Sequence, residues 1–177
     1  NILVVGVEVL TKITNWTDRN TCVLFGDASG AAVLSRAQAT DISKIIDSKI
    51  DADGSMGEYL IQAAGGSRLP ASHETVDANQ HTVYMEGNRI FKNAVKSMFA
   101  SSDELLRRNH LSGADIDWII PHQANLRIIE ALADKMKVPM SKVIVNIQKY
   151  GNTSSATVPL AIDEAVRAKK IRRGDIL

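Results

Sequence analysis

The sequence predicts an α/β fold in which helices pack on a largely parallel or mixed β-sheet. The chain opens on an apolar, β-branched run, ILVVGVEV at residues 2–9, which is typical of a buried strand. From Met85 onward, apolar residues recur every three to four positions, the period of an amphipathic helix. From Asp117 onward, a strand, a polar corner and a helix follow one another twice. Strands that alternate with helices favour a layered α/β domain.

The first half of the chain is expected to supply strands and the loops between them. After the opening strand, CVLFGDASGAAVLSRA at residues 22–37 is interpreted as two short strands around a small-residue turn. The run ISKIIDSKID at residues 42–51 is interpreted as a further strand. Three polar or glycine-rich stretches are interpreted as loops: residues 14–21, 52–60 and 65–81.

The second half is expected to carry the helices. The apolar stripe that starts near Met85 predicts one helix that ends near Asn109. Short strands are predicted at residues 117–121 and 141–147, each followed by a helix. These helices are expected over residues 125–136 and 154–170. A proline near the start of the last helix is tolerated, because a first-turn N–H lacks an intrahelical partner.

Composition and length describe an ordinary globular protein of one domain, residues 1–177. Hydrophobic residues make up 45% and charged residues 23% of the 177 positions, and no apolar run is long enough to cross a membrane. A net charge of +1 argues against nucleic-acid binding, and the single cysteine excludes an internal disulfide and fits the cytoplasm. The chain lacks an initiator methionine and stops as a strand-like run begins. We therefore expect a piece of a longer chain, truncated at both ends.

The charge is unevenly distributed along the chain. Residues 119–177 hold ten Lys and Arg against five Asp and Glu. This excess of positive charge indicates either a solvent-exposed basic face or a docking surface for an acidic partner.

Two polar corners at predicted strand-to-helix junctions are the candidate site. His122 follows the strand at residues 117–121, and Asn152 follows the strand at residues 141–147, next to Gly151. A neutral imidazole and a carboxamide directed at one point suit a carbonyl oxygen that acquires negative charge. A structural histidine and a turn-forming asparagine remain open alternatives. Ser154 or Ser155 is expected to cap the following helix.

Several motifs, in order, resemble a known family. PHQAN at residues 121–125 and YGNTSSATVPLAIDEAV at 150–166 follow FGDASGAAV at 25–33, ADGSMGE at 52–58 and MEGNRIFKNAV at 85–95. Together they resemble the C-terminal half of β-ketoacyl-acyl carrier protein synthase III, of the thiolase-like superfamily. The resemblance covers essentially the whole chain. It implies the C-terminal half of a thiolase-like layered fold, with a mixed sheet and packed helices.

The resemblance implies a Cys–His–Asn catalytic triad. His122 matches the histidine and Asn152 matches the asparagine. The nucleophilic cysteine of this family lies in the N-terminal half, outside these residues. Cys22, in the apolar run TCVLF, is interpreted as a core residue and not as a substitute nucleophile.

The implied reaction is a decarboxylating condensation that initiates fatty-acid synthesis. An acyl starter, with acetyl-CoA expected, is transferred from CoA to the cysteine and then joined to malonyl-acyl carrier protein. His122 and Asn152 are implied to stabilise the enolate oxygen that forms when carbon dioxide leaves. No metal and no cofactor are expected, since CoA and phosphopantetheine thioesters are the substrates.

The resemblance also implies binding residues and partners. Positions implied to contact CoA or the phosphopantetheine arm are Arg19, Gly87, Phe91, Ala124 and Asn125. For Phe91, core packing remains an alternative. Arg127 is implied to dock acyl carrier protein, an acidic partner, and the full-length enzymes are homodimers.

Two rival functions remain at this point. One is a synthase III relative that uses another starter in secondary metabolism. The other is a non-catalytic CoA- or acyl-binding module. The second is disfavoured by the pair His122 and Asn152, because passive binding does not need two donors at one oxygen.

Overall fold

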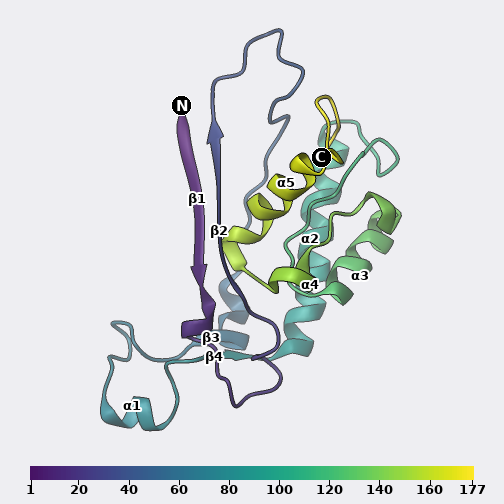
Figure 1. Cartoon of the computed structure of the whole chain (residues 1–177). Helices are drawn as coiled ribbons and strands as arrows, with labels where there is room; N and C mark the ends of the chain where they lie inside the picture. Colours follow the sequence, from purple (N-terminus) through teal and green to yellow (C-terminus); the bar gives the residue numbers. More distant parts are fainter.

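The computed structural model describes residues 1–177 and confirms a layered arrangement of helices and strands (Figure 1). β1 (Ile2–Val9) and β2 (Asp27–Leu34) pair antiparallel, and the short 3-10 helix η1 (Leu10–Lys12) follows β1. α5 (Thr157–Arg167) lies against β2, as Figure 1 shows. None of the helices is long and apolar enough to cross a bilayer.

Glycines let the β1–β2 pair approach the last helix closely. Gly6 and Gly30 are paired across the two strands. A Cβ at Gly6 would lie 2.5 Å from the backbone oxygen of Ser155, and one at Gly30 would lie 2.9 Å from Pro159 Cβ. The small residues of this segment therefore serve close sheet-to-helix packing.

The two helices predicted most directly from periodicity are confirmed. α2 (Gly87–Arg108) and α3 (Leu126–Met136) begin and end within about two residues of the expected positions. They pack against each other and appear side by side in Figure 1. The buried residues of α3 are Ile128, Ile129, Leu132 and Ala133, at the spacing of one helical face.

The core lies on both sides of two short extended segments, residues 118–120 and 143–145. Their residues alternate between two clusters. One cluster joins Ile119, Val143 and Val145 to the α3 residues Ile129 and Ala133. The other joins Trp118, Ile120 and Ile144 to the α5 residues Ala161 and Ala165, with Ile171 beside them. This alternation is the strand periodicity of a layer packed between two helices.

Strands were predicted at residues 117–121 and 141–147, and this prediction is wrong in extent. The two segments meet at a single parallel bridge, Ile119 to Val143. Ile119 donates its N–H to Lys142 (2.8 Å) and Ile144 donates to Ile119 (2.9 Å). A second parallel bridge joins Phe25 to Asn152. Parallel pairing is therefore limited to two isolated bridges, and the two sheets of the structure are antiparallel strand pairs.

Two strand predictions in the first half are wrong, and the opening strand β1 forms as predicted but is largely exposed instead of buried. Residues 22–37 contain one strand, β2, and the stretch DASG lies inside it instead of forming a turn. Cys22 lies in a turn, with its N–H bonded to the oxygen of Asp18 (2.9 Å), and not in an apolar strand. Residues 42–51 form no strand. Their side chains bond to α2, as in the Lys49–Glu104 pair, and no neighbouring strand supplies a ladder.

The expected loops contain short elements. η2 (Gly54–Tyr59) leads into β3 (Leu60–Gln62), which pairs antiparallel with β4 (Val83–Met85). α1 (His73–Asp77) forms within residues 65–81, because Ser72 and Thr75 make a reciprocal capping box. The remaining short helices are η3 (Met140–Lys142), α4 (Ile147–Tyr150) and η4 (Ser154–Ala156).

Candidate functional site

His122 stands between the extended segment 118–120 and α3. Burial lowers the pKa of His122 below its ordinary value, so the imidazole is neutral at pH 7. Its ring makes no hydrogen bond within the chain. A neutral ring carries one N–H donor and one bare nitrogen acceptor. His122 is therefore equipped to donate to an outside acceptor without adding a positive charge.

A cavity of about 440 Å³ adjoins His122. It lies between α2 and the segment that carries the histidine. Its lining residues are Asp51, Ser97, Met98, Ser101, Ser102, Ile119, Ile120, Pro121, His122 and Leu132. Asn152 is not among them, so this cavity holds only one of the two predicted catalytic side chains.

Asn152 occupies the second corner, separated from the end of α4 by Gly151 alone and not at the end of a strand as predicted. Its backbone is fixed by two hydrogen bonds to the segment before β2: Asn152 N–H donates to Leu24 O (2.7 Å), and Gly26 N–H donates to Asn152 O (3.0 Å). The side-chain Oδ1 accepts from the N–H of Ser154 (3.0 Å). This bond orients the carboxamide and leaves its NH₂ group free of partners within the chain.

The predicted serine caps are wrong. Neither η4 nor α5 has a side-chain cap. Ser155 instead donates its N–H (3.1 Å) and its hydroxyl (2.6 Å) to Oε1 of Glu8 in β1. Ser155 therefore binds the distant Glu8 carboxylate and not the helix N-terminus. These bonds join the loop after Asn152 to β1.

Asn125 caps α3, a role that sequence reasoning missed. Its Oδ1 accepts from the N–H of Ile128 (3.1 Å). An asparagine three residues before a helical N–H is a standard N-cap, so the pattern was available in the sequence. Cap formation uses the oxygen and leaves the NH₂ group, which is compatible with the predicted contact to a pantetheine arm. Ala124, beside it, is half-buried.

Two other predicted residues are brought into contact with each other. The guanidinium of Arg127 lies over the ring of Phe91, 5.7 Å from its centroid. Arg127 is exposed and Phe91 is half-buried, so the pair sits at the surface between α2 and α3. Gly87, the first residue of α2, has only Met85 Cε (3.8 Å) near the position of a Cβ.

Arg19 lies apart from these residues in the turn before β2. It is exposed, and the neighbouring Asp18 orders the turn around it. The Asp18 carboxylate accepts from Asn20 N–H (3.0 Å) and from the Thr21 hydroxyl (2.8 Å). The hydrogen bonds from Asn20 and Thr21 lower the pKa of Asp18. The turn therefore presents Arg19 on an ordered backbone.

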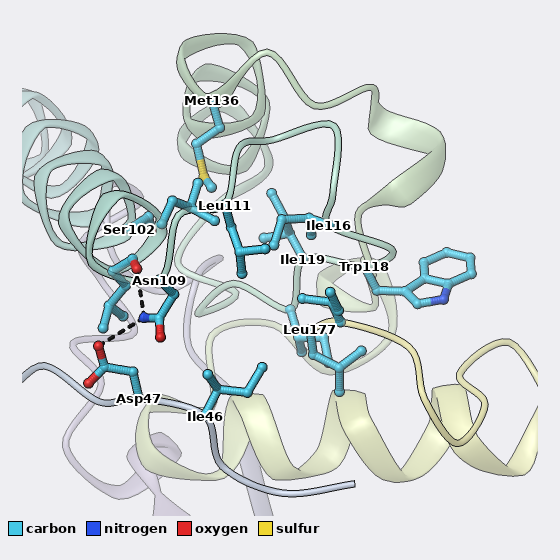
Figure 2. A pocket seen from close by; sticks show the side chains of 14 residues that line it. Ile46, Asp47, Ser102, Asn109, Leu111, Ile116, Trp118, Ile119, Met136 and Leu177 are labelled. Atoms are coloured by element: carbon cyan, nitrogen blue, oxygen red, sulfur yellow. Dashed lines mark hydrogen bonds between the residues drawn. The ribbon is translucent and has the colours of Figure 1, made fainter. Parts of the chain in front are cut away.

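A further cavity, of about 260 Å³, is lined mostly by apolar residues and by neither His122 nor Asn152 (Figure 2). It is lined by α2, the end of α3 and the last residues of the chain. Two of its polar side chains are paired with each other, since Asn109 Nδ2 donates to Asp47 (2.9 Å) as well as to Leu105 O (2.9 Å), as the dashed lines in Figure 2 show. Apart from the Ser102 hydroxyl the lining is largely apolar, and we treat the cavity as core.

Gln123 is a buried polar residue that sequence reasoning did not single out. Only 1% of its surface is exposed. Its Nε2 donates to Pro121 O (3.0 Å) and to Ile144 O (3.1 Å), and its Oε1 accepts from Asn146 N–H (3.1 Å). The sequence signal for a buried, hydrogen-bonded Gln123 was an amide side chain directly after His122, between apolar runs.

Comparisons with known proteins agree with this fold. Residues 106–177 match the family model described as 3-oxoacyl-[acyl-carrier-protein] synthase III C terminal, and residues 1–54 match the model described as 3-oxoacyl-[acyl-carrier-protein] synthase III. Beta-ketoacyl-[acyl-carrier-protein] synthase III of Caldanaerobacter subterraneus is 54% identical over all of this chain and 53% of that protein. The chain spans about half the length of the curated relatives it matches.

Solved structures give the same result. The crystal structure of 3-oxoacyl-[acyl-carrier-protein] synthase III from Aquifex aeolicus matches with a TM-score of 0.83 and 42% identity, over 98% of this chain and 51% of that one. The synthase III structure from Pseudomonas aeruginosa matches with a TM-score of 0.86 and 32% identity, over 98% and 51%. With its thiolase-like fold, the chain belongs to the β-ketoacyl-acyl carrier protein synthase III family and corresponds to its C-terminal half.

Proposed function

We propose that the whole protein is a condensing acyltransferase that initiates fatty-acid synthesis. It joins a short acyl-CoA, with acetyl-CoA as the expected starter, to malonyl-acyl carrier protein with loss of carbon dioxide. This chain contributes His122 and Asn152 as hydrogen-bond donors, and the protein acts as a homodimer in the cytoplasm. Membership in the synthase III family supports the reaction class.

The observation that carries the proposal is the state of the two donors. His122 is held neutral by burial, and the Asn152 carboxamide is oriented by Ser154 with its NH₂ group unengaged. Decarboxylation breaks the bond between the malonyl carbon and its carboxylate, and the electron pair delocalises onto the thioester oxygen. Two neutral donors stabilise that developing oxyanion.

The next step needs a nucleophile that this chain does not supply. The enolate carbon attacks the acyl group on a cysteine, and the cysteine sulfur leaves as thiolate. Cys22 lies in a turn and has no hydrogen bond to His122. We therefore assign the acylated cysteine to the part of the protein outside residues 1–177, since the relatives are about twice as long.

The remaining predicted residues are proposed to guide the carrier's arm. The stacked pair of Arg127 and Phe91 joins a cationic group, suited to an acidic carrier protein, to an aromatic surface suited to an apolar arm. The NH₂ group of Asn125 and the surface of Ala124 and Gly87 extend this path. Arg19 is proposed to contact the phosphate or adenine end of CoA.

A starter assay tests the proposal. The whole protein is given acetyl-CoA, or one of several longer or branched acyl-CoAs, together with malonyl-acyl carrier protein, and the β-ketoacyl product is measured. Preference for acetyl-CoA supports initiation of fatty-acid synthesis. Preference for an unusual starter supports the alternative role in secondary metabolism. Binding of CoA without any product would support a non-catalytic binding module.

The chain by itself gives a second test. Residues 1–177 are expected to form no acetoacetyl product, because the proposed nucleophile lies elsewhere. Product formation that disappears with Cys22→Ala would contradict this assignment and would make Cys22 the nucleophile.

A further inference from the structure

A continuous chain of hydrogen bonds runs from the His122 corner to the Asn152 corner. It begins at Gln123, whose side-chain Nε2 donates to Pro121 O in His122's own segment and to Ile144 O in the neighbouring segment 143–145. Gln123 Oε1 then accepts from Asn146 N–H. Gln123 is 1% exposed and Asn146 is 5% exposed, so these bonds are shielded from water.

Glu164, on α5, is the next member of this chain. Its Oε2 accepts from Asn146 Nδ2 (2.9 Å), and its Oε1 accepts from the Tyr150 hydroxyl (2.8 Å) and from Lys149 Nζ (3.0 Å). One carboxylate thus holds three residues of the segment that leads into Asn152. These bonds, the one from Asn146 first, lower the pKa of Glu164, which keeps it an acceptor at pH 7.

The segment held by Glu164 has little rigidity of its own. α4 is only four residues long, and its N-cap residue Asn146 uses its side chain for Glu164 instead of the helix. Gly151 follows at a φ of 69°, a backbone region in which glycine is unrestrained. A single helical turn next to a glycine does not hold its shape without tertiary contacts.

We propose that Glu164 is a positioning residue that fixes the Asn152 corner relative to His122. Asn146 and Gln123 complete the link. This inference rests on the proposed function, because it assigns Glu164 the task of keeping two donors directed at one oxygen. Glu164 itself touches no substrate. A misplacement of about 1 Å in a donor is enough to cost on the order of 100-fold in rate.

Glu164→Gln is the test variant, and Asp163→Asn is its matched control. Glutamine keeps the size of the side chain, but its NH₂ group replaces one carboxylate oxygen. It therefore cannot accept the hydrogen bond from Asn146 and those from Tyr150 and Lys149 at the same time. Asp163 is the preceding residue of the same helix, and its carboxylate pairs only with Arg167 (2.7 Å) at the surface. In the whole protein, Glu164→Gln is expected to slow carbon dioxide release about 10- to 100-fold. Cysteine acylation, and both rates in the control, are expected to stay within about twofold.

A double variant separates positioning from general stability. If Glu164 acts through Asn152, Glu164→Gln slows an Asn152→Ala protein little further. Equal, multiplicative losses in both backgrounds would overturn the positioning role. If Glu164→Gln does not fold, Tyr150→Phe removes one donor only. A loss confined to decarboxylation then supports the role, and unchanged decarboxylation overturns it.

Amide hydrogen exchange keeps this inference distinct from the proposed function. Residues 146–152 are expected to exchange faster in Glu164→Gln than in Asp163→Asn. If the unmodified protein releases no carbon dioxide, the proposed function is rejected. Faster exchange at residues 146–152 in Glu164→Gln would still support the positioning role. Unchanged exchange together with unchanged rates would overturn the positioning role alone.

Discussion

The carboxylate of Glu8 accepts two hydrogen bonds from Ser155, one from its N–H and one from its hydroxyl, across 147 positions of sequence. The bonds join β1 to the loop that follows Asn152. The hydroxyl and the N–H of Ser155 lower the pKa of Glu8 below its ordinary value of 4.5. The charged form of Glu8 is therefore the form that stabilises the fold.

This relationship predicts a pH-dependent loss of stability in Glu8→Gln. A lowered folded-state pKa stabilises the protein above the unfolded-state pKa, and the contribution disappears as pH falls through the folded-state pKa. At pH 7 the variant is expected to be less stable by about 1 kcal/mol. Urea unfolding at pH 7 and pH 3.5 measures the difference. A deficit that is the same at both pH values would contradict this reading.

Gly151→Ala is expected to disturb the second corner. Gly151 has a φ of 69°, and a Cβ there would lie 2.9 Å from Leu24 O. Backbone strain of this kind costs about 1–3 kcal/mol. The control is Gly66→Ala, where no atom lies within 4 Å of the added Cβ. Thermal unfolding of the two variants checks the prediction, and equal melting temperatures would refute it.

Part of the fold could be predicted from local sequence. The pattern around α2 and α3 predicted both helices, because one helical face determines the spacing of their apolar residues. His122 follows a short extended segment, as predicted from local sequence, but Asn152 follows the unpredicted helix α4 and not a strand. The strand prediction at residues 42–51 failed because an apolar run specifies extended structure only when another strand pairs with it.

Hydrogen-bond partners that lie far apart in the sequence could not be predicted either, because they depend on tertiary packing. Ser155 looked like a helix cap, but its partner is Glu8 in the first strand. Glu164 was not singled out from the sequence, yet its carboxylate accepts hydrogen bonds from Asn146 and Tyr150. Such pairs depend on how the elements pack, and no local pattern encodes them.

Two substitutions of Asn125 separate its cap from its proposed contact with the carrier's arm. Asn125→Asp keeps an oxygen for the N–H of Ile128 and loses the NH₂ donor. Asn125→Ala loses both, and the missing cap is expected to cost about 1 kcal/mol of stability. Both variants are expected to raise KM for malonyl-acyl carrier protein, while only the alanine variant lowers Tm. Unchanged KM in the aspartate variant would show that Asn125 only caps the helix.

Arg127→Glu is expected to weaken carrier docking without changing the chemistry. The stacked guanidinium is exposed beside Phe91, where an acidic carrier can reach it. We expect a roughly tenfold higher KM for malonyl-acyl carrier protein, a loss that shrinks as salt screens the interaction. With malonyl-CoA as substrate the rate stays unchanged. Arg167→Glu, which reverses a cation paired with Asp163, serves as the control. An equal loss with both substrates would argue against docking.

The central claim is that His122 and Asn152 stabilise one enolate oxygen. The most direct measurement is single-turnover acylation from acetyl-CoA beside carbon dioxide release from malonyl-acyl carrier protein, in the whole protein. His122→Ala and Asn152→Ala should each slow decarboxylation about 10²–10³-fold and still acylate the cysteine. The exposed His73→Ala should match the unchanged protein. Lost acylation with intact decarboxylation in Asn152→Ala would contradict the account, because Asn152 would then serve the nucleophile.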